Sequence, residues 1–219
     1  MRKLTCLARL NRMFDARIRR LEFIAASAAR RSDSSVDRLI AFVTIEALTT
    51  WSNFSREFYL SCALLSPKTI SGRRVSHTTS GISNERQALL RSIQVLKPNR
   101  YNEAARSVQI ARRDEPTWHE KLSLPRMAQD LNLSNQAFIV AGLSYPTTFF
   151  NDLPVVRNFY AHRSYGSAQR VQELARRNYG IRNLLHPTTL LNHTLIGSTQ
   201  TLILEWLGDM RAITDTLCN

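Results

Sequence analysis

Three side chains that lie close together in the sequence have the functional groups that cleavage of a phosphodiester requires. Arg157, Asn158 and His162 belong to the stretch VVRNFYAHR, which covers residues 155–163. A histidine can act as acid or base near neutral pH, and an arginine stays protonated and can bind two phosphate oxygens at once. Cleavage of RNA without a metal needs both functions, because the ribose 2′-OH must lose a proton while the phosphorus gains negative charge. The sequence therefore predicts that these three residues are catalytic.

The spacing of these residues places two of them on one face of a helix. Asn158 and His162 are four residues apart, so their side chains would lie one above the other on a helix. Tyr165 and Gln169 would continue this stripe, and the long side chain of Arg157 can reach towards it. One histidine cannot easily transfer both protons of the reaction, but two copies of the motif facing each other across a dimer could.

Ordinary structural roles are an alternative for the same residues. Arg157 could be a surface arginine, His162 a helix histidine with a structural partner, and Asn158 a buried amide that fixes how its helix packs. A second, shorter pattern, RNLLH at residues 182–186, lies between a glycine and a proline and is interpreted as a loop.

The motif is expected to lie inside one long helix. Its apolar pattern runs over residues 153–178 and ends near Gly180, which gives a motif helix within 153–180. Asp152 is expected to be the N-cap of this helix and Pro154 to lie in its first turn.

Three residues after the catalytic ones are predicted to bind substrate. These are Arg163, Tyr165 and Arg170, of which the two arginines suit the phosphates of RNA. Further arginines on the same helix, Arg176 and Arg177, extend its positive charge. The alternative for all four arginines is an ordinary solvated face of the helix.

The rest of the chain is also predicted to be helical, which makes the fold class all-α. Apolar residues recur at spacings of three and four and indicate helices at 4–30, 36–65, 85–96, 101–112, 118–132, 134–143 and 188–217. Residues 66–84 break this pattern, because they are rich in Ser, Thr and Gly and hold few large apolar side chains. We interpret them as a flexible basic loop inserted into a single domain over residues 1–219. We expect almost no strand.

The charge of the chain points to a polyanionic partner. It carries 30 Lys and Arg against 17 Asp and Glu, for a formal net charge of +13. The excess lies in residues 1–31, 67–113 and 153–182, and the remainder is acidic. Such basic clusters gain affinity for nucleic acids by releasing phosphate counterions, so RNA is the expected partner.

Other features narrow the setting in which the protein acts. The three cysteines, Cys6, Cys62 and Cys218, are too far apart for a metal-binding or redox pair, which suggests a reducing cytoplasm. The remaining histidines are isolated in the sequence, so we expect neither a metal nor a cofactor. No apolar run approaches the ~20 residues of a membrane span, and we expect no membrane association.

The stretch RNFYAHR resembles the Arg-polar-x(3–5)-His signature of HEPN domains, with Arg157, Asn158 and His162 in the family's positions. The resemblance implies an all-α, HEPN-like helical bundle and a symmetric homodimer that brings two motifs together. It also implies metal-independent RNA cleavage by 2′-OH attack, which leaves a 2′,3′-cyclic phosphate. The implied biology is a toxin or an antiviral defence effector, with an antitoxin or another defence-system protein as a possible partner. Some toxin members carry a tyrosine two residues after the histidine. Here Tyr165 is three residues after it, so a regulatory role is not carried over.

An alternative of another class remains open. The chain could be a catalytically silent basic helical module that binds nucleic acid or a partner protein. It would then bind in a salt-sensitive manner and release no product.

Overall fold

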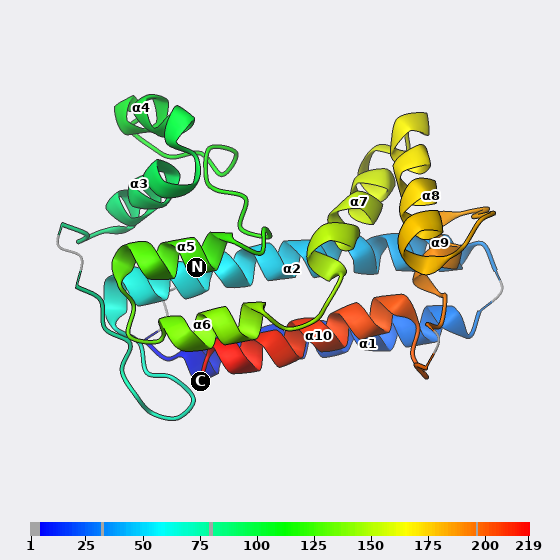
Figure 1. Cartoon of the computed structure of the whole chain (residues 1–219), viewed down its shortest axis with the longest axis horizontal. Coiled ribbons are helices and arrows are strands. Elements are labelled where there is room, and N and C mark those ends of the chain that lie inside the picture. Colours follow the sequence, from blue (N-terminus) through cyan, green and yellow to red (C-terminus); the bar gives the residue numbers. More distant parts are fainter. Residues whose placement is uncertain (1–4, 32, 79–80, 196) are drawn as a thin grey trace. The chain divides into compact units, whose positions relative to one another are not determined.

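The structure is a computed structural model of the chain, and it describes residues 5–31, 33–78, 81–195 and 197–219. These residues form ten α-helices, and the part of the chain described contains no strand beyond three isolated bridges (Figure 1). The predicted all-α class is thereby confirmed. Within these same residues, none of the helices has both the length and the apolar character needed to cross a bilayer.

The chain divides into two compact units. The first comprises the residues up to Phe14, Trp51–Tyr145 and Ala212–Asn219, and the second comprises Asp15–Thr50 and Pro146–Arg211. Three of the four divisions fall inside helices, namely α1 (Leu7–Ala29), α2 (Ser35–Leu65) and α10 (Leu202–Leu217), and the fourth lies outside any helix, between Tyr145 and Pro146. The single domain expected over residues 1–219 remains a prediction.

The first unit contains the four short helices of the middle of the chain: α3 (Glu85–Leu96), α4 (Pro98–Arg106), α5 (Ser123–Leu131) and α6 (Gln136–Leu143). Aromatic rings from α1 and α2 form its core, with the ring centroids of Phe14 and Phe54 4.9 Å apart. The helix α6 packs closely on the end of α10, because a Cβ at Gly142 would lie 3.3 Å from the carbonyl oxygen of Ile213. This close approach explains a glycine inside an otherwise apolar helix.

The second unit contains the motif. Its own helices are α7 (Phe149–His162), α8 (Tyr165–Tyr179) and α9 (Pro187–Leu191), and α7 and α8 lie side by side as a hairpin (Figure 1). Their facing sides are fully buried at Leu153, Val156, Val171 and Ala175. In the same unit α1 is tied to α10, because Arg211 donates to Asp15 over 2.6 Å. The motif therefore sits on an element that packs through a conventional apolar stripe.

Several predicted helices match the structure and others are shorter. The helices at 36–65 and 85–96 agree with α2 and α3, and the predicted range 4–30 agrees with α1, although residue 4 lies outside the described residues. Helices α5 and α6 lie within the ranges predicted at 118–132 and 134–143, whereas α4 overlaps the range 101–112 but starts at Pro98 and ends at Arg106.

The prediction of one helix over 153–178 was wrong. The chain leaves the helix at Arg163, whose φ of 46° and ψ of 34° are left-handed, and Ser164 then starts α8 with a capping box to Ser167. A serine can satisfy the free N–H groups of a new helix, which favours a break here. The break separates Tyr165 and Gln169 from the stripe of Asn158 and His162.

Two further predictions of helix bounds were also wrong. The helix α7 starts earlier than expected, so Pro154 lies inside it and Asp152 is a buried residue of the first turn, not the N-cap. The final helix predicted over 188–217 is interrupted, and α9 ends at Leu191 before α10 begins. Between the two helices, the N–H of Leu202 donates to the carbonyl of His193.

The loop expected at 66–84 is outside any helix in its described part, and residues 79–80 lie outside the described residues. Its beginning is held by backbone hydrogen bonds, which join Lys68 to Thr5 and Ile70 to Cys218 over 3.0 and 2.8 Å. These bonds attach the start of the loop to the two ends of the chain in the first unit.

Candidate functional site

The three predicted catalytic residues lie in the last two turns of α7. Arg157 and Asn158 are half-buried, and His162 is exposed as the last residue of the helix. The motif is therefore at the end of an element, where a ligand can approach.

Helix geometry brings Asn158 and His162 together and sets Arg157 to one side. Asn158 and His162 share a face, whereas Arg157 is turned about 100° from Asn158 around the helix axis. Among the described residues, none of the three side chains has a hydrogen bond or an ion pair within the chain. Their polar groups are thus uncommitted, and those of Arg157 and Asn158 are not among the buried polar atoms that lack a partner.

The remaining side of the same turn anchors the helix. The hydroxyl of Tyr160 lies 2.9 Å from that of Thr188, which donates over 2.8 Å to the carboxylate of Asp37 at the start of α2. The ring of His186 packs edge-on against Phe159, with centroids 5.8 Å apart. Burial raises the pKa of Tyr160 far above its ordinary value, so this phenol stays protonated. The cluster holds the end of α7 in place.

The RNLLH stretch contributes a structural histidine to this cluster. The Nδ1 atom of His186 accepts from the backbone N–H of Thr188 over 3.2 Å and caps α9, with the carboxylate of Asp37 3.4 Å away. Residues 182–186 are not helical, as the sequence predicted. The short spacing of this second pattern therefore belongs to a loop that supports the first.

Of the predicted substrate-binding residues, two are free and one is engaged. Arg163 forms an ion pair with Asp37 over 3.1 Å, a contact that the sequence gave no means to predict. Arg170 is exposed and has no partner among the described residues, and the side chain of Tyr165 is 80 % exposed at the start of α8. The substrate-binding role of all three stays a prediction, and Arg163 would have to share its charge with Asp37.

A buried carboxylate fixes the other end of the α7–α8 hairpin. Asp152 is 2 % exposed and accepts from the hydroxyl of Tyr179 over 2.5 Å and from the amide of Asn178 over 3.2 Å. Thr148 joins the network, because its hydroxyl lies 2.9 Å from that of Tyr179 and accepts from the indole N–H of Trp206. Burial, followed by the hydrogen bond to Asp152, raises the pKa of Tyr179. The network thus aligns α7 from its first turn.

Replacing Tyr179 by phenylalanine should destabilise the protein without touching the motif. The change removes the shortest hydrogen bond of a buried carboxylate, so we expect the free energy of unfolding to fall by about 1–3 kcal/mol. Urea unfolding followed by far-UV circular dichroism measures this. Tyr145→Phe, at an exposed tyrosine, is the control and should leave the unfolding midpoint unchanged. An equal midpoint for both variants would show that the network contributes nothing.

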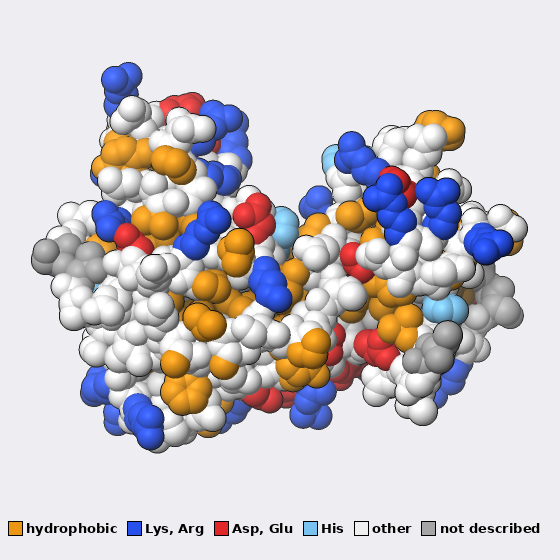
Figure 2. Space-filling model, in the orientation of Figure 1, with side chains coloured by type: hydrophobic (Ala, Val, Ile, Leu, Met, Phe, Trp, Pro, Cys, Tyr) orange, Lys and Arg blue, Asp and Glu red, His pale blue; other side chains and the backbone are white. Residues whose placement is uncertain are grey.

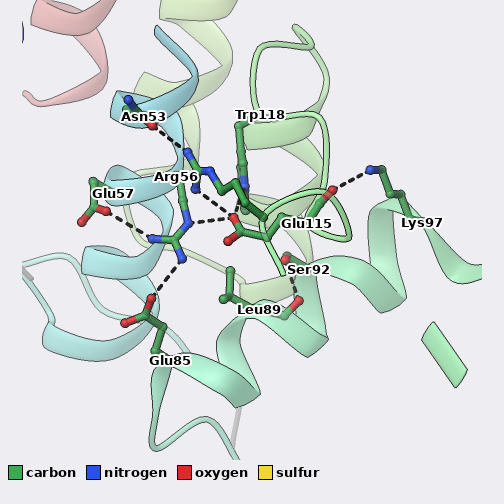
Figure 3. A network of polar contacts seen from close by, with 10 residues as sticks. Asn53, Arg56, Glu57, Glu85, Leu89, Ser92, Lys97, Glu115 and Trp118 are labelled. Carbon is green, nitrogen blue, oxygen red and sulfur yellow. Dashed lines mark hydrogen bonds and ion pairs between the residues drawn. The ribbon is translucent and has the colours of Figure 1, made fainter. Parts of the chain in front are cut away.

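A further polar cluster lies in the first unit and was not predicted from the sequence. Arg56 of α2 donates to three carboxylates, those of Glu57, Glu85 and Glu115, and Glu115 also accepts from Trp118 (Figure 3). The side chains of Arg56 and Glu115 are 14 % and 3 % exposed, so this network is internal. Because its charges are paired with each other, it fits a structural role.

Comparison with known proteins provides no further assignment. No family of known proteins matches the chain, and neither the characterised proteins nor the solved structures contain a significant match. Within the described residues, no group of three or more His, Cys, Asp or Glu side chains is arranged to hold a metal ion.

Proposed function

We propose that the protein is a metal-independent endoribonuclease of the HEPN type. The observation that carries the proposal is the set of three uncommitted polar side chains, Arg157, Asn158 and His162, at the solvent-accessible end of α7. The anchoring cluster on the other side of this helix end supports it, since catalytic groups need a fixed base. The proposed biology is that of a toxin or a defence effector.

Each of the three residues has a distinct task in the proposed reaction. His162 removes the proton of the ribose 2′-OH, or protonates the 5′-oxygen that leaves. Arg157 stabilises the negative charge that builds on the phosphorane, and Asn158 orients the scissile phosphate by hydrogen bonding to it. The 2′-oxygen forms a bond to phosphorus as the bond to the 5′-oxygen breaks, which yields a 2′,3′-cyclic phosphate and a 5′-hydroxyl.

The second proton transfer would come from a second copy of the chain. His162 is exposed at a helix end, so the same surface of another copy can face it. A symmetric homodimer would then hold two motifs around one phosphate, with one histidine as base and the other as acid. This arrangement requires no residue beyond those of the motif.

A cleavage assay in the presence of EDTA tests the proposal. Wild-type protein is incubated with total tRNA and with an RNA of mixed sequence, and the product ends are identified. We expect cleavage that leaves cyclic phosphates, and a rate about 10²–10⁴-fold lower for His162→Ala, because a positioned acid or base contributes that much. His193→Ala, at a half-buried histidine outside α7, is the control and should cleave at the wild-type rate.

Two results would reject the proposal. Cleavage that EDTA abolishes would indicate metal-dependent chemistry, and full activity of His162→Ala would remove the motif from the reaction. Salt-sensitive binding of RNA by a wild-type protein that releases no product would favour the silent binding module instead.

A further inference from the structure

A groove with a mixed polar and apolar lining runs along α8 in the second unit. It has a volume of about 650 Å³, and its lining includes Gln169, Gln172 and Arg176 of α8 and Arg182 and Asn183 of the following segment. In Figure 2, Lys and Arg side chains gather over α8. The groove is open to solvent on one side and is formed entirely by residues of this unit.

The groove exists because the chain reverses at Gly180. This residue ends α8 with a φ of 67°, a left-handed conformation that glycine adopts without strain, and its N–H donates to the carbonyl of Ala175. The segment after it then turns back, with Leu184 buried as an anchor and Leu185 94 % exposed. One wall of the groove is thus a helix face and the other is an anchored loop.

The lining of the groove has the chemistry of a site for a nucleic-acid backbone. Arg176 and Arg182 have no ion-pair or hydrogen-bond partner among the described residues, so both guanidinium groups are available to phosphates. The one acidic residue of the lining, Glu173, is already paired with Arg177. The lining also includes three side-chain amides, which donate to phosphate and sugar oxygens: Gln169, Gln172 and Asn183.

The α8 face of the groove also leads towards the motif. Gln169, Gln172 and Arg176 repeat at spacings of three and four, and Tyr165 lies one turn before Gln169 on the same face. From Tyr165 to Arg176 the helix rises about 16 Å. Because Tyr165 follows His162 by only three residues, this face begins beside the end of α7 that carries the motif.

We propose that the groove binds the backbone of single-stranded RNA and that Tyr165 stacks on a base at the end of the groove next to the motif. Exposed tyrosines stack on bases of any sequence, whereas a duplex offers no free base to them. The inference deepens the proposed endoribonuclease function and rests on it for the link to catalysis. The binding itself is independent of any reaction.

Affinity for an uncleavable strand tests the groove directly. The probe is a single-stranded 2′-O-methyl RNA of mixed sequence, which lacks the attacking hydroxyl, and it is titrated into the full chain at several salt concentrations. We expect Arg176→Gln/Arg182→Gln to weaken binding about tenfold. The decrease of log affinity with log salt should also become less steep, by about 1.4, because two phosphate contacts are lost. Tyr165→Ala should weaken binding about fivefold or more with an unchanged slope, because stacking releases no counterions.

The control variant removes the same charge elsewhere. Arg106→Gln/Arg126→Gln replaces two exposed arginines, the last residue of α4 and one residue of α5, both outside the lining. Wild-type affinity for the control, together with the loss in the groove variant, supports the proposal. Equal losses of affinity in both variants would show that RNA responds only to the net charge of the protein, which would overturn the proposal. Tighter binding of a poly-glutamate peptide than of RNA would also overturn it, in favour of an acidic protein partner.

Cleavage measured in parallel separates this inference from the function on which it rests. If the wild type cleaves and the groove variant shows unchanged binding and KM, the groove proposal fails and the enzyme remains. If the wild type does not cleave but the groove variant loses affinity as expected, the enzyme proposal fails and the groove remains. Where both hold, the groove variant raises KM and leaves kcat unchanged.

Discussion

Replacing Arg157 by alanine is expected to slow RNA cleavage by about 10²–10³-fold, the cost of removing one group that stabilises charge in a transition state. Arg157→Lys should recover only part of this loss, because an ammonium group cannot bind two phosphate oxygens in one plane. Single-turnover cleavage with saturating enzyme measures both rates and excludes effects on binding.

Stability measurements on the same variants distinguish catalysis from structure. Arg157 is half-buried and has no partner within the described chain, so its truncation should change the free energy of unfolding by no more than about 0.5 kcal/mol. The control is Arg126→Ala, at an exposed position of α5, which should retain the wild-type rate. Loss of stability with an unchanged rate would assign Arg157 to the structure and refute the proposed role.

Helices could be predicted from the sequence wherever the spacing of apolar residues alone determined their bounds. Apolar residues at spacings of three and four gave α2 and α3 almost to the residue, because burial of one stripe decides whether such a segment is helical. The break at Arg163 was missed because the apolar pattern continues through it as Val171 and Ala175. Two short helices of a hairpin and one long helix bury the same kinds of residue, so periodicity alone cannot distinguish them. The motif S-x-x-S at Ser164 was the one local signal.

For the candidate site, the sequence predicted the relative positions of residues on one helix but not the contacts of that helix with the rest of the unit. The position of Asn158 one turn before His162 follows from their spacing, and the structure retains it. The contacts that anchor this helix end come from Asp37 and Thr188, which are more than a hundred residues apart. No local pattern connects such residues, because their meeting depends on how the whole unit packs. For the same reason the ion pair between Arg163 and Asp37 could not be predicted. This ion pair makes Arg163 less available to bind a phosphate.

The cluster around Arg56 follows from a packing arrangement of this kind. Arg56 lies in the middle of α2, among residues such as Phe54 and Phe58 that are at most 3 % exposed. Burial alone would lower the pKa of Arg56, but the hydrogen bond and charge of Glu115, followed by those of Glu85, raise it above its ordinary value. Glu115 in turn accepts from Trp118 (Figure 3) and from Arg112, each over 3.0 Å. The cluster therefore attaches the irregular segment before α5 to α2 and α3.

Replacing Arg56 by methionine should be among the most destabilising single changes in the protein. Methionine fills most of the space but leaves Glu57 buried without its cation and Glu115 with only the half-exposed Arg112, so we expect the free energy of unfolding to fall by about 3–5 kcal/mol. Arg56→Lys should cost less, because one charge remains to pair with Glu115.

The cause of this loss can be tested by removing the stranded charge. Unfolding in guanidinium chloride, followed by far-UV circular dichroism, compares Arg56→Met with Arg56→Met/Glu115→Gln, and the double variant should regain part of the stability because less buried charge is left unpaired. The control is Arg100→Met, at an arginine that pairs with Glu103 while both side chains are at least 65 % exposed. An exposed pair contributes about 0–1 kcal/mol, so this variant should unfold almost as the wild type does. Equal, small losses for Arg56→Met and Arg100→Met would mean that the internal cluster is no more important to stability than a surface ion pair.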